Sequence, residues 1–207
     1  MTSPKGVSPI ASNKTSPVLV LASESPRRLA LLKQAGVVPH AVRPASVDET
    51  PLKGELPRAY AIRVARAKAQ TVASKWSDGP AVFLAADTVV ACGRRILPKA
   101  ENDIEVRACL DILSGRRHQV LTTVVLLHEG RLRMRTVETR MSFKRLTEDE
   151  IAGYLRSGEG IGKAGGYAIQ GRAETFVRQI NGSYSNVVGL PLLETIGLLG
   201  SCGVAIS

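Results

Sequence analysis

The sequence predicts an α/β fold, in which the strands of a mixed sheet are flanked by helices. Two apolar segments, residues 18–22 and 81–91, are short and rich in small or branched residues, as expected of buried strands. Between them, residues 57–76 are dense in Ala, Arg and Lys, and their apolar positions recur at helical spacing. Aromatic residues make up only 4% of the chain. The core must therefore consist mainly of aliphatic side chains packed in layers.

The first predicted unit is a strand, a tight turn and a helix within residues 18–36. Ser25 is a suitable helix cap, Pro26 fits the first helical position, and Gly36 marks the end of the helix. A short strand is expected near residues 40–43, followed by a loop that contains Asp48 and Glu49. The pattern thus places a helix amino terminus directly after a buried strand.

The second half of the chain continues the alternation. Asn102 is expected to cap a helix that ends at Leu113, and Thr147 with Glu150 forms a capping box for another. Between these helices, residues 120–127 and 132–143 form two strands joined by a turn. A glycine-rich stretch, residues 160–171, is predicted to be a loop whose backbone approaches another group closely. Short strands near residues 175–180 and a last helix at residues 191–199 complete the prediction.

Length and composition favour one domain. The chain has 207 residues, of which 44% are hydrophobic, enough to build one core. Residues 1–17 are rich in Ser, Thr, Pro and Lys and are expected to be a disordered tail, which leaves residues 18–207 as the domain. No apolar run approaches the roughly 18 to 20 residues that a membrane-spanning helix needs. The tail also lacks the apolar segment of a secretory signal.

The cysteine, histidine and charge patterns exclude some kinds of site and favour one that binds an anion. Three widely spaced cysteines suit neither a disulfide framework nor a zinc site, so a reducing cytoplasm is expected. The three histidines have no ligand spacing and are expected at the surface or in turns. A net charge of +10 favours an anionic partner. Because the positive residues are spread along the chain, a small phosphate site is favoured over a nucleic-acid surface.

The first candidate site is the start of the first predicted helix. Ser23 precedes it, and Arg27 and Arg28 lie in its first turn, where the helix dipole disfavours cations. Two arginines there indicate an anion held between them and the free N–H groups of the helix. The alternative is that both arginines face solvent and Ser25 is only a cap.

The second candidate site is Asp87, the one acid in a strand that is otherwise apolar. An unpaired buried carboxylate would cost several kcal/mol, so it needs a metal, a cation or a reacting water as its partner. A structural salt bridge is the alternative. Asp48 and Glu49 in the loop, Lys68 on the long helix and Lys99 after the strand could complete a magnesium and phosphate site, since Mg²⁺ needs only one or two carboxylates besides phosphate and water. Each of these four also has an ordinary surface interpretation.

The glycine-rich loop matches neither the phosphate-loop pattern nor the dinucleotide fingerprint. It does contain Gln170, whose amide can donate and accept at once and so can pair with the edge of a nucleotide base.

Several motifs, in this order and spacing, together resemble the Maf family. They are Leu21-Ala22-Ser23-Glu24-Ser25-Pro26-Arg27-Arg28, Val47-Asp48-Glu49, Ala85-Ala86-Asp87-Thr88-Val89-Val90, Leu113-Ser114-Gly115-Arg116, the run from Lys163 to Gly171, and Asn186-Val187-Val188-Gly189-Leu190-Pro191. The similarity extends from about residue 18 to residue 200. It implies an elongated, two-lobed mixed sheet with flanking helices and a deep central groove, akin to inosine triphosphate pyrophosphatases, and a homodimer.

The resemblance also implies the reaction and the residues that perform it. The family hydrolyses nucleoside triphosphates to the monophosphate and pyrophosphate with a divalent cation, Mg²⁺ or Mn²⁺. Asp87 matches the family's proton acceptor. Positions that line its phosphate and metal site are matched by Ser23, Arg28, Glu49, Lys68 and Lys99, with Glu49 and Asp87 as the metal ligands and Lys163 retained in the loop.

Within that family, Arg27, Thr88 and Gln170 match the branch that acts on dTTP and UTP. Two departures concern local shape: Pro98-Lys99-Ala100 replaces the common Gly-Lys-Pro, and Gly162 replaces an Asp. Two alternatives stay open. One is a broader activity on modified pyrimidine nucleotides such as 5-methyl-UTP. The other is a basic regulatory or nucleic-acid-binding protein linked to cell division and septum formation.

Overall fold

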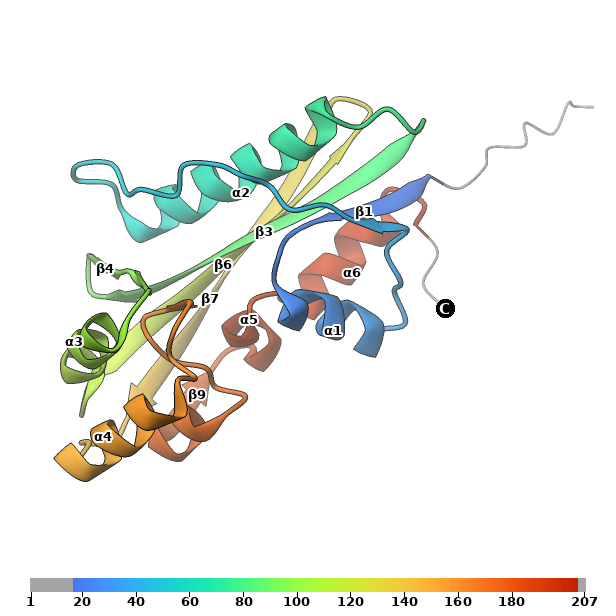
Figure 1. Cartoon of the computed structure of the whole chain (residues 1–207). Helices are drawn as coiled ribbons and strands as arrows, with labels where there is room; N and C mark the ends of the chain where they lie inside the picture. Colours follow the sequence, from blue (N-terminus) through green and yellow to red (C-terminus); the bar gives the residue numbers. More distant parts are fainter. Residues whose placement is uncertain (1–16, 205–207) are drawn as a thin grey trace, which may run out of the picture.

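A mixed sheet with three long central strands forms the spine of the protein. A computed structural model describes residues 17–204, and Figure 1 shows these strands running the length of the molecule. They are β3 (Ala81–Cys92), β6 (Arg117–His128) and β7 (Arg131–Phe143), and each is antiparallel to the next. The strand order is β2-β1-β3-β6-β7-β9, with β4 paired to the end of β3. The short strands are β1 (Val18–Ala22), β2 (Ala41–Val42), β4 (Arg95–Leu97) and β9 (Val177–Asn181).

Helices cover both faces of this sheet. The long helix α2 (Pro57–Ser74) crosses one face, where its buried alanines pack against β1 and β3. The other face and the far end carry the remaining helices (Figure 1), which share a second, larger core. They are α1 (Pro26–Gln34), α3 (Asp103–Leu113), α4 (Glu148–Ser157), α5 (Tyr184–Val188) and α6 (Leu192–Gly200). The predicted α/β class, a mixed sheet with flanking helices, is confirmed.

The alternation of side chains along β3 decides where its polar residues point. Leu84 and Ala86 belong to the larger core, whereas Phe83 and Ala85 pack in the core under α2. Since successive residues of a strand face opposite sides of the sheet, Asp87 continues the row that faces α2. Thr88 continues the row that faces α1 and α5. Asp87 and Thr88 are therefore adjacent in the strand, but their side chains lie on opposite faces of the sheet.

Most predicted elements are present close to their predicted bounds. Asn102 caps α3 by accepting a hydrogen bond from the Glu105 N–H, and Thr147 and Glu150 form the predicted capping box of α4. Ser25 stands at the cap position of α1, but its side chain makes no capping bond. Instead, the Ser25 N–H donates to the Ser23 hydroxyl. The prediction that Ser25 caps through its hydroxyl is therefore wrong.

Two predictions near the carboxyl end need revision. Residues 160–171 are not entirely loop, because β8 (Lys163–Ala164) pairs antiparallel with β5 (Lys99–Ala100). The strand expected near residues 175–180 is present as β9, but its first two expected residues belong to a 3-10 helix at Arg172–Phe176. The pattern also gave no warning of α5, whose five residues are too few to show a periodicity. The expected tail, residues 1–17, lies outside the described residues except for Pro17.

The expectation that all three histidines lie at the surface or in turns is wrong for His118, which is buried. Its Nε2 lies 2.9 Å from the Tyr167 hydroxyl, and its ring packs edge-on against Phe143. Burial lowers the pKa of His118 to about 4. Nearby, the Tyr154 hydroxyl accepts a hydrogen bond from the Ala168 N–H. This aromatic cluster therefore anchors the glycine-rich segment to the sheet.

Among the helices within residues 17–204, none is both long enough and apolar enough to cross a membrane.

Candidate active site

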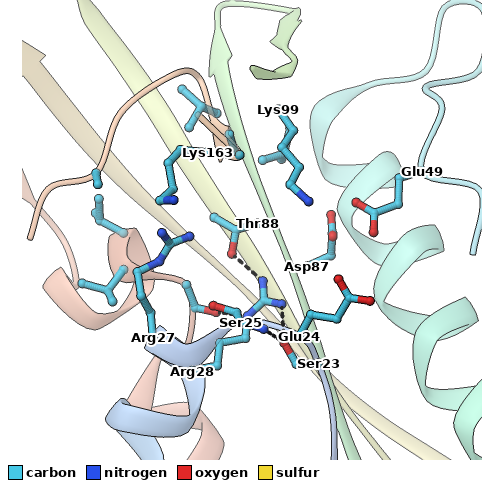
Figure 2. Close-up of a pocket in the computed structure, with 18 of the residues that line it drawn as sticks. Ser23, Glu24, Ser25, Arg27, Arg28, Glu49, Asp87, Thr88, Lys99 and Lys163 are labelled. Atoms are coloured by element: carbon cyan, nitrogen blue, oxygen red, sulfur yellow. Dashed lines mark hydrogen bonds between the residues drawn. The ribbon is translucent and has the colours of Figure 1, made fainter. Parts of the chain in front are cut away.

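A cavity of about 540 Å³ opens where the two sides of the molecule meet. It is lined by the turn from β1 into α1, the loop before α2, the inward face of α2, the middle of β3, residues 96–99, the glycine-rich segment and the end of α5. Figure 2 shows their polar side chains converging on one space. Among the lining residues, five are cationic and three are acidic: Arg27, Arg28, Lys68, Lys99 and Lys163, with Glu24, Glu49 and Asp87. The excess of cations suits an anionic ligand.

The acidic side of the pocket is organised by one lysine. The Lys68 ammonium group lies 2.8 Å from Oδ1 of Asp87 and 2.8 Å from Oε1 of Glu49. Lys68 comes from the inward face of α2, and its side chain and that of Asp87 are both buried. Glu49 is held from the same helix, because the Tyr60 hydroxyl donates to the Glu49 carbonyl oxygen at 2.8 Å. One helix therefore fixes both carboxylates.

Asp87 retains one oxygen that no described group satisfies. Its Oδ2 is buried and has no hydrogen-bond partner within the described part of the chain. Burial raises the pKa of Asp87 above its ordinary value, although the ion pair with Lys68 and the charge of Arg28 oppose that rise. A carboxylate in this state readily takes up a proton or a cation. Oδ2 of Asp87 is therefore the oxygen available to accept a proton or to bind a cation.

The residues present fit a divalent cation. Asp87 offers the unsatisfied Oδ2, and the Glu49 side chain is partly exposed to the pocket. No group of three or more His, Cys, Asp or Glu suited to a metal occurs in residues 17–204. Mg²⁺, however, keeps several waters and binds through one or two carboxylates together with substrate phosphates. Two carboxylates in a phosphate pocket therefore meet the requirement.

The opposite side of the pocket is cationic. Figure 2 shows Arg27, Lys99 and Lys163 directed into the same space from α1, β5 and β8. The pKa of Lys163 is lowered by burial and by the charges of Arg27 and Lys99. Mutual repulsion of three cations is relieved by a polyvalent anion. The pairing of β5 with β8 brings Lys99 and Lys163 together, which the sequence alone could not indicate.

Arg28 differs from these cations because it is tied into the wall of the pocket. Its guanidinium donates to the Gly189 carbonyl at 2.8 Å, to the Ser23 hydroxyl at 3.2 Å and to the Thr88 hydroxyl at 3.1 Å. Burial lowers its pKa, and the charge of Asp87 opposes that shift. Through these three bonds Arg28 connects α1 to the end of β1, to β3 and to the end of α5. Its neighbour Arg27 points into the cavity instead.

The structure brings all ten predicted site residues to this one cavity: Ser23, Arg27, Arg28, Glu49, Lys68, Asp87, Thr88, Lys99, Lys163 and Gln170. Asp48, the other loop carboxylate considered from the sequence, does not line it and instead accepts the Thr50 N–H. The roles assigned to these residues stay predictions. The altered loop positions keep a defined shape, since Gly162 has a φ of +70° and donates to the Ala100 carbonyl.

Sequence reasoning assigned no role to three residues that shape the pocket. Figure 2 shows the Glu24 carboxylate on the same side of the pocket as those of Glu49 and Asp87. Tyr60 holds the Glu49 backbone, and Gly189 accepts from Arg28. Glu24 and Gly189 lay within the recognised motifs, but only their contacts distinguish them from neighbouring positions.

Comparison with known proteins places the chain in a family. Residues 18–202 match the family model described as Maf-like protein. The chain belongs to the Maf family. A protein of Rhodopseudomonas palustris named dTTP/UTP pyrophosphatase is 60% identical over 195 residues, which cover 92% of this chain and 94% of that protein. Proteins of the same name from Paramagnetospirillum magneticum and Caulobacter vibrioides are 60% and 56% identical, covering 91% and 90% of this chain and 98% and 96% of the relatives.

Among solved structures, the Ham1 protein of Staphylococcus aureus matches with a TM-score of 0.41 and 16% identity. The match covers 60% of this Maf-family chain and 71% of the Ham1 chain.

Gly189 provides a test of the backbone conformation in the wall of the pocket. It has a φ of +125°, which L residues rarely adopt, while a Cβ there would make ordinary van der Waals contacts, 3.4 Å from the Thr88 hydroxyl oxygen and 3.6 Å from Nε of Arg28. We expect Gly189→Ala to lower the free energy of unfolding by more than about 1 kcal/mol, because a side chain strains the backbone at this φ. Urea denaturation measures this. Gly93→Ala is the control, since Gly93 has a φ of +61°, in the left-handed region that L residues enter at a smaller cost. Equal losses in the two variants would contradict additional backbone strain at residue 189.

Proposed function

We propose that this Maf-family enzyme hydrolyses dTTP and UTP to the monophosphate and pyrophosphate. The observation that carries the proposal is the divided pocket: a buried, incompletely satisfied carboxylate lies on one side, and on the other lie Arg27, Lys99 and Lys163, which form no salt bridge with another described residue. The names of the three relatives support the same activity. They give no support to the alternative of a nucleic-acid-binding or septum-related regulator.

The two sides of the pocket give the triphosphate an orientation. We place the β and γ phosphates, which carry most of the negative charge, against Arg27, Lys99 and Lys163. The α phosphate then lies toward Asp87 and Glu49, where the scissile bond to the bridging oxygen is cleaved. This arrangement lets the leaving pyrophosphate develop its charge beside the lysines, which stabilises the transition state electrostatically.

Asp87 is the proposed general base. Its Oδ2 accepts a proton from a water that attacks the α phosphorus, and the bond from that phosphorus to the α,β-bridging oxygen breaks with the electron pair going to pyrophosphate. Lys68 holds the other oxygen, Oδ1, and so fixes the direction of Oδ2. Burial raises the pKa of Asp87, which makes its carboxylate a stronger proton acceptor than an ordinary aspartate.

Glu49 and Asp87 are the proposed ligands of a divalent cation, Mg²⁺ or Mn²⁺. When bound, such an ion neutralises phosphate charge and increases the acidity of water. Glu24 faces the same space and could hold a water of the ion's hydration shell.

The base of the nucleotide is assigned to the glycine-rich segment. Gln170 lines the pocket, and the aromatic cluster behind it holds the segment against the sheet. An amide that donates and accepts pairs with the edge of a pyrimidine. Modified pyrimidines such as 5-methyl-UTP belong to the same proposal, because the methyl group leaves the pairing edge unchanged.

The family resemblance further supports a homodimer. The three free cysteines support a reducing compartment such as the cytoplasm. Light scattering and cell fractionation test these two proposals.

The proposed activity is tested by pyrophosphate release from a panel of triphosphates. We expect dTTP, UTP and 5-methyl-UTP to be hydrolysed with kcat/KM at least about tenfold above that for ATP and GTP, since a base-pairing amide in the pocket discriminates between base edges. Removal of divalent ions by a chelator should abolish turnover, and Mg²⁺ or Mn²⁺ should restore it. Hydrolysis of ATP and GTP at the same kcat/KM would contradict the pyrimidine assignment.

Asp87→Asn tests the proposed base. The amide keeps the shape of the side chain but accepts protons poorly, so we expect kcat to fall by a factor on the order of 10² or more. The fold should persist, because Lys68 retains its ion pair with Glu49 and a buried charge is removed. Circular dichroism checks the fold and pyrophosphate release gives kcat. Full activity in a folded variant would refute the assignment.

Lys68→Met should displace the acidic limb of the pH profile. Burial raises the pKa of Asp87, and the charge of Lys68 is the largest effect that lowers it. Without Lys68 the pKa of Asp87 rises further, so the base becomes protonated, and activity is lost, at a higher pH than in the wild type. The measurement is kcat/KM against pH, which reports groups of the free enzyme. Lys75→Met, at the exposed end of α2, is the control and should leave the limb in place. If the acidic limb of the Lys68→Met profile stayed at the wild-type pH, the group that titrates there would not be Asp87.

A further inference from the structure

A ring of hydrogen bonds behind the pocket joins Arg28 to the interior of the sheet. The Arg28 guanidinium donates to the Thr88 hydroxyl at 3.1 Å, and the Thr88 hydroxyl lies 2.9 Å from that of Thr122 on β6. Thr122 donates to the carbonyl oxygen of Asn186 in α5 at 2.9 Å. Three residues later, the Gly189 carbonyl accepts from Nε of Arg28 and completes the ring. Figure 2 shows the part of this ring that borders the pocket.

The direction of each bond in the ring follows from the number of protons. A threonine hydroxyl has one proton, and that of Thr122 is committed to the Asn186 carbonyl. In the contact between the two threonines, Thr88 must therefore be the donor. The Thr88 oxygen is then available to accept from Arg28, which can only donate. The ring thus has a single consistent direction, from the guanidinium to the backbone of α5.

This direction changes the role of Thr88. Its only proton points away from the pocket toward Thr122, and its oxygen already accepts from Arg28. A substrate group that needs a hydrogen-bond donor cannot obtain one from Thr88. The residue therefore acts on a ligand through Arg28, whose three bonds leave two of its five N–H groups for an anion.

The far end of the ring is firmly held. Thr122 and Asn186 are fully buried. The Asn186 side chain donates to the Val120 carbonyl at 3.0 Å and to the Thr139 hydroxyl at 2.9 Å, which attaches α5 to β6 and β7. Because an unsatisfied buried polar group is costly, the Asn186 carbonyl retains Thr122 as its donor. The sheet interior thereby fixes the orientation of Arg28.

We propose that Thr122 is a positioning residue for triphosphate binding: by accepting the hydrogen bond of the Thr88 hydroxyl, it turns the Thr88 oxygen toward Arg28 and aims the guanidinium at the phosphates. Thr122 does not line the cavity, so it acts through Thr88 and Arg28. The inference rests on the proposed function for the identity of the substrate, but the hydrogen-bond ring itself does not depend on turnover.

The test compares the purified full-length protein with Thr122→Val, Thr122→Ser and Thr195→Val. Valine removes the hydroxyl at nearly constant volume, whereas serine keeps it. Thr195→Val is the matched control, because Thr195 is also fully buried and donates to a backbone carbonyl, that of Pro191, outside the pocket. We expect Thr122→Val to raise KM for dTTP about tenfold with kcat within about threefold, since Thr88 loses the acceptor that holds its oxygen toward Arg28 while Asp87 is untouched. Thr122→Ser and Thr195→Val should keep the wild-type KM.

A second measurement avoids turnover and separates this inference from the proposed activity. Calorimetric titration with inorganic tripolyphosphate should show Kd raised about tenfold in Thr122→Val and in Thr88→Val. The double variant should bind no more weakly than either single one, since both changes break the same ring. An unchanged Kd in folded Thr122→Val, or a loss that Thr122→Ser does not restore, would overturn the inference. If tripolyphosphate follows the expected pattern but dTTP is not hydrolysed, the proposed function fails and the positioning role of Thr122 stands.

Discussion

The site depends on one electrostatic constraint, the burial of an ionisable carboxylate in the middle of a sheet. Asp87 is buried in the middle of β3, and the Lys68 ammonium group that reaches it from α2 offsets the cost of burying its charge. The same lysine binds Glu49, which brings the loop before α2 to the pocket. Lys68 satisfies one oxygen of Asp87, whereas the other has no hydrogen-bond partner among the described residues.

The sheet places an acidic wall and a cationic wall on the two sides of one pocket. Asp87 and Thr88 are adjacent in sequence but face opposite sides of β3, so one strand contributes to an acidic wall organised by α2 and to a cationic wall organised by Arg28. Lys99 and Lys163 extend the cationic wall because β5 and β8 pair. In the proposed mechanism a triphosphate spans the two walls, and its orientation follows from this division of charge.

The parts of the fold that the sequence predicted are those with strong local signals. The capping box of α4 and the Asn102 cap of α3 are contained within four residues, and the long strands have continuous apolar or alternating patterns. Prediction failed where a sequence pattern was short, or where the structure of a residue depended on contacts with residues far away in the chain. Ser25 has the residue type of a cap, but its N–H binds Ser23. His118 is a polar residue and was expected at the surface, but it is buried because Tyr167 and Phe143 pack around it.

By itself, the sequence determined the α/β class, the family and the residue types of the site, because recurrent motifs and hydrophobic periodicity are local properties of the chain. Only the tertiary structure decided which charges share a space. Lys68 bridges two carboxylates, Arg28 is committed to the wall, and Arg27 beside it faces the cavity. Hydrogen-bond direction and desolvation depend on groups that are far apart in sequence, as in the ring from Arg28 to Asn186, and no local pattern encodes them.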